Sequence, residues 1–470
     1  MGRGLTGSAF DAARAMFLLD VLASLIAWPL TLWLLLGMAP LGALAGSLPL
    51  VLYPACYLLL LYSLGLYRRD ALIETGRALQ RVPFAAGLGA LLATLLTLLL
   101  ILLLDGLVPP GLPQLFAAAS VGLALAGCAA RGVFRVLRRL RLFRRRLLII
   151  GAGQRAWDLA WLLRHEGRTA GYVIACVHGP EMGQADPRLE NDPDIEIFRG
   201  NVGFLPAARE FGADQIVVAP DERRGLRMEA LLACRTAGFP VREYLGCLEQ
   251  EIGRIDMKRL ELGWLLYSDG FSASQLDHAM KRSLDIVVSL ALLVATAPFL
   301  LLAALAVKLQ DGGPVLYRQS RVTRDGRAFR IMKLRTMLVD AEKHGATWAA
   351  KGDPRVTAIG RFLRRSRIDE LPQLLNVLLG DMALVGPRPE RPEFIDRLAR
   401  ELPLYDERHR VKAGLTGWAQ VNYPYGASLE DARSKLSYDL YYVKNFNLMF
   451  DLRILAQTLR VVLFPGGGAR

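Results

Sequence analysis

Four apolar runs at the N-terminus constrain the fold of this chain more than any other feature. They cover about residues 16–37, 47–66, 83–104 and 112–130. Each approaches the roughly 20 residues that a helix needs to cross a bilayer. At 53% hydrophobic residues, the chain is also too apolar for an ordinary soluble enzyme. We therefore expect a membrane protein in which residues 1–130 form a bundle of four transmembrane helices.

Basic residues predict the orientation of this bundle. The loops 38–46 and 105–111 contain no lysine or arginine, whereas the loop between the second and third runs and the linker 131–146 are rich in arginine. The arginines concerned are Arg68, Arg69, Arg77, Arg81, Arg131, Arg135, Arg138, Arg139, Arg141, Arg144, Arg145 and Arg146. Because basic residues beside membrane spans stay in the cytoplasm, we expect both ends of the bundle and all that follows to be cytoplasmic.

The net charge of +14 does not by itself indicate a nucleic-acid partner. Much of it lies in the linker 131–146, where arginine is attracted to anionic lipid headgroups, and no nucleic-acid reader motif accompanies it. Five cysteines without a Cys-x-x-Cys pair, and five scattered histidines, also speak against a disulfide framework or a zinc enzyme.

A second folding unit is expected over residues 147–250. Leu147–Ile150 is typical of a buried strand, and the turn Gly151-Ala152-Gly153-Gln154-Arg155-Ala156 resembles the G-x-G-x-x-G/A turn of dinucleotide folds. Helical stretches separate three further expected strands, at 172–177, 215–219 and 241–244. This pattern predicts a Rossmann-like α/β domain with a parallel sheet.

The role of this middle domain stays open between two readings. Its second strand ends at His178 without an acid for a ribose hydroxyl, and the chain contains no Tyr-x-x-x-Lys pair. A nucleotide-sugar dehydratase or epimerase needs both. The pattern favours a structural, regulatory or dimerising role, with nucleotide binding as the alternative.

A fifth apolar run, 286–309, allows two arrangements. As an ordinary span it would place the strongly basic residues after it outside the cell. A helix broken at Pro298, entering and leaving by the same face, keeps both flanks cytoplasmic, because proline removes a helical bond and bends the helix. The freed carbonyls then need partners, such as the side chain of Thr296. We expect a reentrant helix over 281–310, after a linker at 251–280.

Two adjacent acids, Asp369 and Glu370, are the candidate catalytic residues. They follow Arg364 and Arg365 and open a helix predicted for 369–379. Neighbours on a helix point about 100° apart, so the two carboxylates suit different roles, one attacking phosphorus and the other holding Mg²⁺. The helix dipole and the arginines should keep a carboxylate ionised. The alternative is that Asp-Glu-x-Pro is only a helix beginning.

Other basic residues of the segment 311–470 are candidate phosphate ligands. Arg388 stands between two prolines that restrict its backbone, which suits a preorganised contact, although a rigid turn with an exposed arginine gives the same pattern. Lys333 and Arg335 follow an expected strand at 329–332.

Four motifs in this segment carry a resemblance to a known family. They are Gly352 to Thr357, Arg364 with Asp369 to Val377, Gly380-Asp381-Met382 with Val385 to Pro389, and Gly414 to Val421. Together they resemble the bacterial sugar transferases, the polyprenyl-phosphate hexose-1-phosphate transferases that begin exopolysaccharide and O-antigen assembly. The match covers about 280–470, and the preceding bundle and Rossmann-like domain resemble the large members of the family.

The resemblance implies a two-step reaction in the bacterial inner membrane, with the catalytic domain on the cytoplasmic side. Asp369 would attack the sugar-side phosphorus of a UDP-sugar and release UMP, and undecaprenyl phosphate would then take the phosphosugar. Glu370 would hold Mg²⁺. The phosphate-binding residues would be Arg364, Arg388, Lys333 and Arg335. A homodimer through the middle domain and downstream glycosyltransferase partners are further expectations.

Some features leave alternatives open. The reentrant break reads Ala297-Pro298, where the family usually has Ser-Pro, and Ala413 replaces a proline. The stretch 449–464 suits either a helix in the membrane interface or a core-packing helix.

The sequence does not identify the sugar that is transferred. Two other functions compete, an inactive membrane scaffold or regulator and a nucleotide-sugar-modifying enzyme that uses the middle domain.

Overall fold

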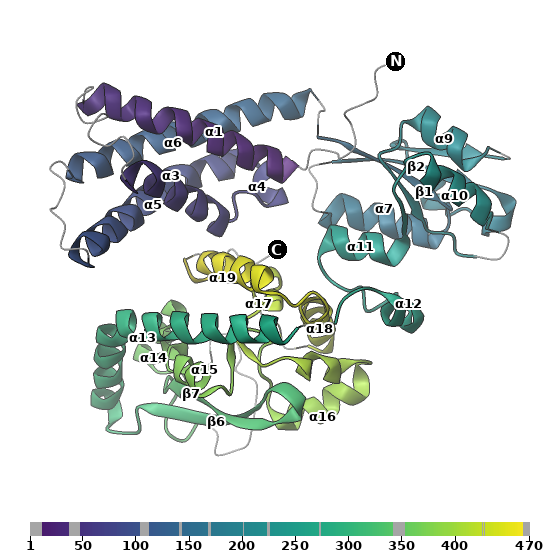
Figure 1. The fold of residues 1–470 in the computed structure, drawn as a ribbon. Helices are drawn as coiled ribbons and strands as arrows, with labels where there is room; N and C mark the ends of the chain where they lie inside the picture. Colours follow the sequence, from purple (N-terminus) through teal and green to yellow (C-terminus); the bar gives the residue numbers. More distant parts are fainter. Residues whose placement is uncertain are drawn as a thin grey trace. The chain divides into compact units, whose positions relative to one another are not determined.

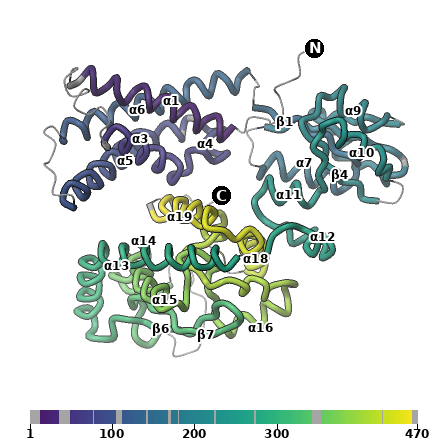
Figure 2. Tube along the Cα trace, viewed as in Figure 1, coloured from purple at the N-terminus to yellow at the C-terminus, as the bar shows by residue number. Residues whose placement is uncertain are grey.

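The computed structural model describes most of the chain as two compact units, Met1–Gly253 and Arg254–Arg470 (Figures 1 and 2). The described residues are 12–36, 48–103, 112–140, 143–167, 171–200, 202–222, 226–271, 274–341, 353–424, 426 and 428–463. The loops 38–46 and 105–111, on which the predicted orientation partly depends, lie outside these residues. So do Arg141 and Gly352.

The apolar runs of the first unit form helices. They are α1 (Ala12–Leu36), α3 (Leu48–Ser63), α5 (Thr75–Leu103) and α6 (Leu112–Arg139), with the short α4 (Arg69–Ile73) before α5. By length and composition α1, α5 and α6 can each cross a membrane, whereas α3 has 16 residues and is short for a span. Residues 131–139 of the predicted basic linker are the last turns of α6. Arg131 of α6 pairs with Asp20 of α1 at 3.0 Å, which offsets two buried charges.

The middle domain has the predicted parallel sheet. Its strands are β1 (Arg145–Ile150), β2 (Tyr172–His178), β3 (Ile195–Arg199), β4 (Gln215–Val218) and β5 (Val241–Glu243), in the order β3-β2-β1-β4-β5. Its helices are α7 (Gln154–Glu166), α8 (Pro187–Glu190), α9 (Phe204–Phe211), α10 (Met228–Thr236) and α11 (Tyr244–Ile252), with a 3₁₀ turn η1 (Pro180–Met182). Leu147–Ile150 is fully buried at the centre, as expected of a strand covered on both faces. The strand β3 was not predicted.

The second unit begins inside the predicted linker 251–280. That segment contains α12 (Leu262–Tyr267) and the first turns of α13 (Gln275–Asp311), which starts at a capping box formed by Ser274 and Asp277. The helix expected from residue 281 thus begins at Gln275.

The helix α13 contains the fifth apolar run. It is assigned as one helix of 37 residues that includes Pro298, and it bends within its length (Figures 1 and 2). A proline inside a helix is the usual cause of such a bend. Thr296 donates to the Leu292 carbonyl at 2.7 Å, so its hydroxyl does not reach the Val294 carbonyl that the proline leaves unpaired. The side chains along this helix are largely exposed and apolar.

The rest of the second unit packs around three apolar clusters, the largest of which includes Leu374, Trp418 and Ile454. Its strands are β6 (Leu316–Val322), β7 (Ala328–Leu334), β8 (Ala383–Val385) and β9 (Gly414–Thr416), the first two pairing antiparallel and the last two parallel. Its helices are α14 (Ala358–Ser366), α15 (Gln373–Leu379), α16 (Pro392–Glu401), α17 (Trp418–Asn422), α18 (Leu429–Lys444) and α19 (Leu448–Leu463). Three 3₁₀ segments connect them, η2 (Arg324–Gly326), η3 (Ile368–Glu370) and η4 (Tyr405–Arg410). The predicted helix 369–379 is thus two elements, η3 and α15.

The C-terminal helix α19 has an unusual polarity. Its buried face carries Asp451, Gln457 and Arg460 beside the apolar Phe450 and Ile454, whereas its exposed positions are apolar apart from Arg453. The exposed apolar residues are Met449, Leu452, Leu459 and Val462. The helix therefore packs against the core of the unit, as one of the two predicted alternatives expects, while its placement at a membrane interface stays a prediction.

Candidate active site

The two candidate acids lie at a sharp chain reversal between α14 and α15. Arg367 ends α14 in the left-handed region, with φ of +60°, and Ile368–Glu370 then form the 3₁₀ turn η3. A non-glycine residue in this region costs roughly 1–2 kcal/mol and persists where the surroundings require it. Ile368 packs against Leu363 and Leu334, which anchors the turn. The backbone therefore presents Asp369 and Glu370 from a constrained turn.

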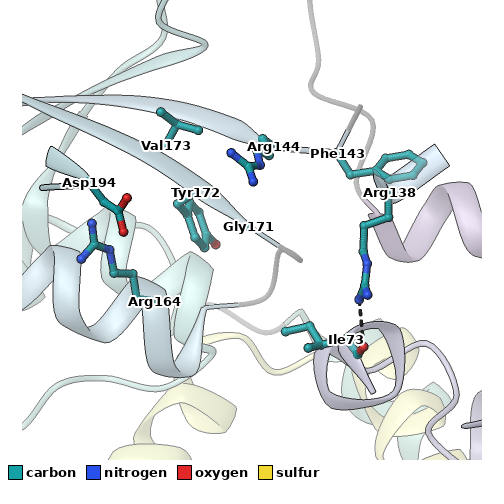
Figure 3. Close-up of a pocket in the computed structure, with 9 residues that line it drawn as sticks. All are labelled: Ile73, Arg138, Phe143, Arg144, Arg164, Gly171, Tyr172, Val173 and Asp194. Carbon is teal, nitrogen blue, oxygen red and sulfur yellow. Dashed lines mark hydrogen bonds between the residues drawn. The ribbon is translucent and has the colours of Figure 1, made fainter. Parts of the chain in front are cut away.

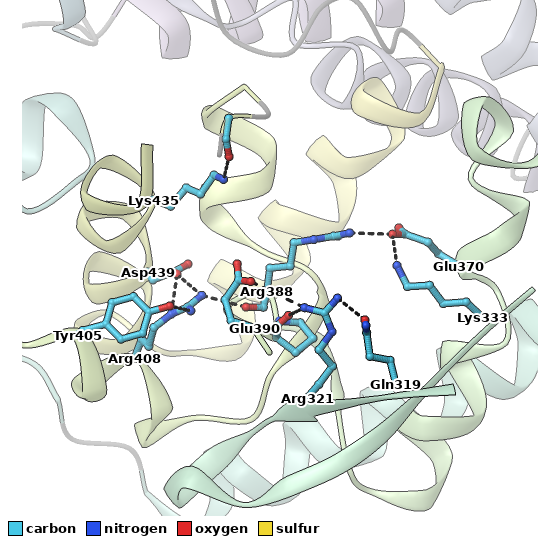
Figure 4. A network of polar contacts seen from close by, with 12 residues as sticks. Gln319, Arg321, Lys333, Glu370, Arg388, Glu390, Tyr405, Arg408, Lys435 and Asp439 are labelled. Carbon is cyan, nitrogen blue, oxygen red and sulfur yellow. Dashed lines mark hydrogen bonds and ion pairs between the residues drawn. The ribbon is translucent and has the colours of Figure 1, made fainter. Parts of the chain in front are cut away.

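Glu370 is held by three cations (Figure 4). Its Oε1 accepts from Arg388 Nη2 at 2.9 Å and from Lys333 Nζ at 3.1 Å. Its Oε2 lies 3.6 Å from Arg367 Nη1. Burial raises the pKa of Glu370, but the charges of Arg388, Lys333 and Arg367 lower it by more. The pKa of Glu370 therefore lies below its ordinary value. Glu370 is therefore ionised throughout the physiological range.

Asp369 has a different environment from its neighbour. It is 7% exposed, and its Oδ1 has no hydrogen-bond partner. Burial, and next the charge of Glu370, raise the pKa of Asp369 to about 6, against the opposing effect of Lys333, Arg364 and Arg367. The local cations thus lower the pKa of Glu370, whereas burial and the charge of Glu370 dominate at Asp369.

Asp369 is still mostly ionised at neutral pH. A carboxylate oxygen without a hydrogen-bond donor can attack an electrophile that enters the site, because no hydrogen bond must first be broken. The pair thus has two distinct electrostatic states, as adjacent carboxylates with different tasks often do.

The other predicted residues divide into two groups. Arg364 Nε donates to Thr336 Oγ1 at 2.8 Å, and its charge acts on Asp369. Arg335 is not brought to the cluster, because its guanidinium pairs with Asp311 and donates to the Pro314 carbonyl at 2.7 Å. Lys333, Arg364 and Arg388 therefore surround the acids, whereas Arg335 secures the end of α13.

Some contributors escaped sequence reasoning. Arg367 stands three residues before Glu370, a spacing at which side chains meet on a helical turn, and this signal was available. Arg408 and Asp439 also join the network through the backbone of Arg388, but they come from segments far apart in the chain (Figure 4). No local pattern marks that pair.

The glycine-rich turn of the middle domain is closed by the chain itself. Asp221 Oδ2 accepts from the backbone N–H of Gln154 at 2.7 Å, and Oδ1 accepts from that of Arg155 at 2.9 Å. A Cβ added at Gly153 would lie 2.1 Å from Asp221 Oδ2. A carboxylate thus occupies the helix N-terminus at which a dinucleotide phosphate binds in related folds. This contact favours the structural reading of the domain.

A cavity of about 500 Å³ lies elsewhere in the first unit (Figure 3). Its lining residues are Ile73, Arg138, Phe143, Arg144, Arg164, Gly171, Tyr172, Val173 and Asp194. Two of its arginines have structural partners, since Arg138 donates to the Ile73 carbonyl at 2.9 Å and Arg164 pairs with Asp192 at 2.5 Å. None of the predicted site residues lines this cavity.

Comparison with known proteins places the acids within a recognised family region. The family model described as "Bacterial sugar transferase" matches residues 276–465. This range contains Asp369 and Glu370 and the cations around them, Lys333, Arg364, Arg367 and Arg388. The match ends at residue 465, just after the C-terminal helix α19.

Several curated proteins are similar to the chain. An Aeromonas hydrophila UDP-N-acetylgalactosamine-undecaprenyl-phosphate N-acetylgalactosaminephosphotransferase is 42% identical over 253 residues, 53% of this chain and 58% of that protein. UDP-glucose:undecaprenyl-phosphate glucose-1-phosphate transferases from Escherichia coli (strain K12) and Caulobacter vibrioides are 40% and 45% identical. The matches cover 40% of the chain and 40% of the first protein, and 39% of the chain and 69% of the second. The chain thus spans about half the length of the first relatives.

Proposed function

The chain belongs to the bacterial sugar transferase family, and from this premise we propose that it transfers a sugar 1-phosphate from a UDP-sugar to undecaprenyl phosphate. One observation carries the proposal. A buried carboxylate with an unpartnered oxygen, Asp369, lies beside a cluster of cations that suits phosphate. The product, undecaprenyl-diphosphate-sugar, would begin the assembly of an exopolysaccharide or O-antigen.

In the first step Asp369 is the nucleophile. Its free oxygen attacks the sugar-side phosphorus of the donor, and the bridging oxygen between the two phosphorus atoms leaves with UMP. A phosphosugar-aspartate remains. Arg388, Lys333 and Arg364 neutralise the phosphoryl oxygens as the charge on the leaving UMP develops.

In the second step undecaprenyl phosphate is the acceptor. One of its phosphate oxygens attacks the phosphorus of the phosphosugar-aspartate, the acyl-phosphate bond breaks, and Asp369 is regenerated as a carboxylate. The same cations can serve both steps, because the donor of the first step and the product of the second are both diphosphates. One site can therefore bind the donor and the acceptor.

Mg²⁺ fits the donor set in a limited way. Within the described residues no three potential ligands cluster to hold a metal, but Mg²⁺ commonly takes one or two carboxylates and completes its shell with substrate phosphates and water. Glu370 would hold it, since Glu370 Oε2 is 3.6 Å from Arg367 and so free of a close donor there. When bound, the ion would offset the charge of the donor diphosphate.

The raised pKa of Asp369 predicts the pH dependence of the reaction. The attacking form is the carboxylate, so kcat/KM for UMP release should fall as the pH drops through about 6. An unperturbed aspartate would keep its activity down to about pH 4. A profile measured from pH 4.5 to 8, with enzyme stability checked at each pH, tests this. An acid limb near pH 4 would contradict the described environment.

We further propose that the catalytic unit is seated in the cytoplasmic face of the inner membrane. The bend of α13 would let the helix enter and leave by one face, as expected of a reentrant segment. The apolar outward face of α19 would lie in the headgroup boundary, where an uncovered apolar helix face is stable. Lys281 of α13 pairs with Asp451 of α19 at 2.5 Å, so an ion pair links the two helices that would contact the membrane.

Cysteine labelling tests this placement with a matched control. Met449 on α19 is 73% exposed, and the Arg397 side chain on α16 is 68% exposed. In inverted inner-membrane vesicles, Met449→Cys should react with a bulky water-soluble maleimide at least about tenfold more slowly than Arg397→Cys, because lipid covers only the first. Four of the five native cysteines are buried, so wild type supplies the background. Equal rates for the two variants would refute the placement.

A panel of donors tests the proposed reaction. Purified enzyme is mixed with undecaprenyl phosphate, Mg²⁺ and UDP-glucose, UDP-galactose or UDP-N-acetylhexosamines, and UMP and labelled lipid are measured. At least one donor should yield both products in equal amounts. No labelled lipid with any donor would favour the inactive scaffold, and NAD(H) binding by the enzyme would revive the nucleotide-sugar-modifying alternative. We also propose a homodimer. The molecular mass of the solubilised protein should then be twice that of one chain, and the mass of a single chain would refute the proposal.

A further inference from the structure

The segment that carries Arg388 is held at almost every residue. Each backbone contact of this segment, residues 383–390, comes from another part of the second unit. In the order of residues 383 to 390, the partners are Ala413, Asp285, Lys281 with Tyr442, Thr416, Gly414, Arg408, Arg321 and Val322. Residues 383–385 form the strand β8 beside β9, but residues 386–390 lie outside any helix or strand, where backbone groups are normally left to water.

Arg408 is the anchor at Arg388 itself. Its Nη2 donates to the Arg388 carbonyl at 2.9 Å and to Asp439 Oδ2 at 2.8 Å. Its Nε also donates to Asp439 Oδ2 at 3.1 Å, and its Nη1 donates to the Tyr405 hydroxyl at 2.7 Å. Figure 4 shows the resulting chain of contacts, which runs from Asp439 through Arg408 and Arg388 to Glu370.

A second buried pair anchors the other end of the segment. Lys281 Nζ donates to the Val385 carbonyl at 3.0 Å and pairs with Asp451 at 2.5 Å. The Tyr442 hydroxyl lies 2.8 Å from Asp451 Oδ1 and 3.1 Å from the same carbonyl. The residues before and after the turn into Arg388 are thus both fixed by charged side chains.

Buried ion pairs such as these contribute little to stability, because both charges lose their hydration. The side chains of Arg408 and Asp439 are 6% and 3% exposed, and well-packed apolar residues often replace a buried ion pair without loss of stability. What an apolar pair lacks is a donor for the Arg388 carbonyl. The guanidinium fork supplies that donor while its remaining N–H groups keep it in a single orientation.

We propose that Arg408 and Asp439 are positioning residues for Arg388, which fix its backbone so that the guanidinium meets Glu370 and the donor phosphates without rearrangement. The inference rests on the proposed function, because only that function gives Arg388 a phosphate to bind. Preorganisation of this kind matters because a displacement of about 1 Å at a reacting group can change the rate about 10²-fold.

The test uses the full-length enzyme and the variant Arg408→Lys. Lysine keeps the charge but lacks the fork, so it cannot reach Asp439, Tyr405 and the Arg388 carbonyl together. We expect kcat/KM to fall by about 10²-fold. In an Arg388→Ala background the same change should cost less than about threefold, because the group that it positions is already gone.

The control is Leu436→Ala, in the same helix as Asp439. Leu436 is 1% exposed and packs in an apolar cluster with Leu398 and Leu440. Its truncation should destabilise α18 without removing a hydrogen-bond donor to the Arg388 segment. Its activity per folded molecule should stay within about twofold of wild type. Equal losses from Arg408→Lys in both backgrounds, or losses matched by Leu436→Ala at equal folded fraction, would overturn the proposal.

Hydrogen exchange gives a readout that does not depend on activity. Arg408→Lys should raise the exchange rate of the amides of Leu384, Val385, Gly386 and Arg388 by at least tenfold, whereas Leu436→Ala should leave them unchanged. Unchanged exchange in Arg408→Lys would also overturn the proposal. A wild-type enzyme that releases no UMP from any donor would instead sink the proposed function, and the exchange result would still decide whether Arg408 fixes the segment.

Discussion

Asp369→Asn should abolish the release of UMP from a UDP-sugar while the protein still inserts and folds. Asparagine has nearly the same shape, but its amide oxygen is a far weaker nucleophile and forms no stable acyl phosphate. Loss of a covalent nucleophile typically lowers the rate by several orders of magnitude. Because Asp369 Oδ1 has no partner, the replacement breaks no hydrogen bond at that atom. The expected result is therefore a folded enzyme without turnover.

The matched control is Asp396→Asn, an exposed acid on α16 in the same unit. Its activity should stay within about twofold of wild type, since surface changes away from special features have small effects. Wild-type enzyme incubated with donor alone should gain the mass of a phosphosugar on Asp369, and Asp369→Asn should not. Full turnover by Asp369→Asn, or transfer that needs donor and acceptor together with no adduct, would end the assignment of the nucleophile.

Glu370→Gln is expected to damage both stability and activity. The carboxylate of Glu370 offsets Lys333 and Arg388, and its removal leaves those cations facing one another without a counter-charge. Breaking a buried ion pair costs about 3–5 kcal/mol; we expect about 2–3 kcal/mol in the free energy of unfolding, because the Arg388 side chain is 38% exposed and retains solvent. UMP release should fall at least about 10²-fold as the phosphate-binding cations lose their positions.

Chemical denaturation and UMP release measure the two effects separately. Glu393→Gln, an exposed acid on α16, is the control and should change neither. Any residual activity of Glu370→Gln should have its acid limb below that of wild type, because the charge of Glu370 raises the pKa of Asp369. A variant with unchanged stability and activity would show that Glu370 does not organise the cluster.

The elements readable from the sequence are those whose residues bury a continuous apolar face. Leu147–Ile150 is such a run, and it forms the central strand β1. The strand β3 was missed because Glu196 and Arg199 interrupt its pattern, as an edge strand allows. The apolar runs of α1, α5 and α6 were likewise evident, since a membrane helix needs little beyond length and composition.

The candidate site was only partly readable. Asp369, Glu370 and Arg388 lie in motifs whose residue types carry the chemistry. The pairing of Arg335 with Asp311 was not readable, because β7 ends at Leu334, beyond which the alternation of side chains no longer predicts direction. Contacts such as that of Asp221 with Gln154 join residues 67 positions apart, and no local pattern encodes them. Long-range pairs of this kind require the fold.

One feature of α13 bears on where the reaction can take place. Asp285 accepts from the Leu384 amide at 3.0 Å and Lys281 donates to the Val385 carbonyl at 3.0 Å, so no flexible tether separates this helix from the Arg388 segment. With α13 seated in lipid as proposed, the depth of the reacting phosphorus is set by the leaflet. An acceptor carried on a lipid would then reach the site by lateral diffusion in that leaflet, at the fixed height of Arg388.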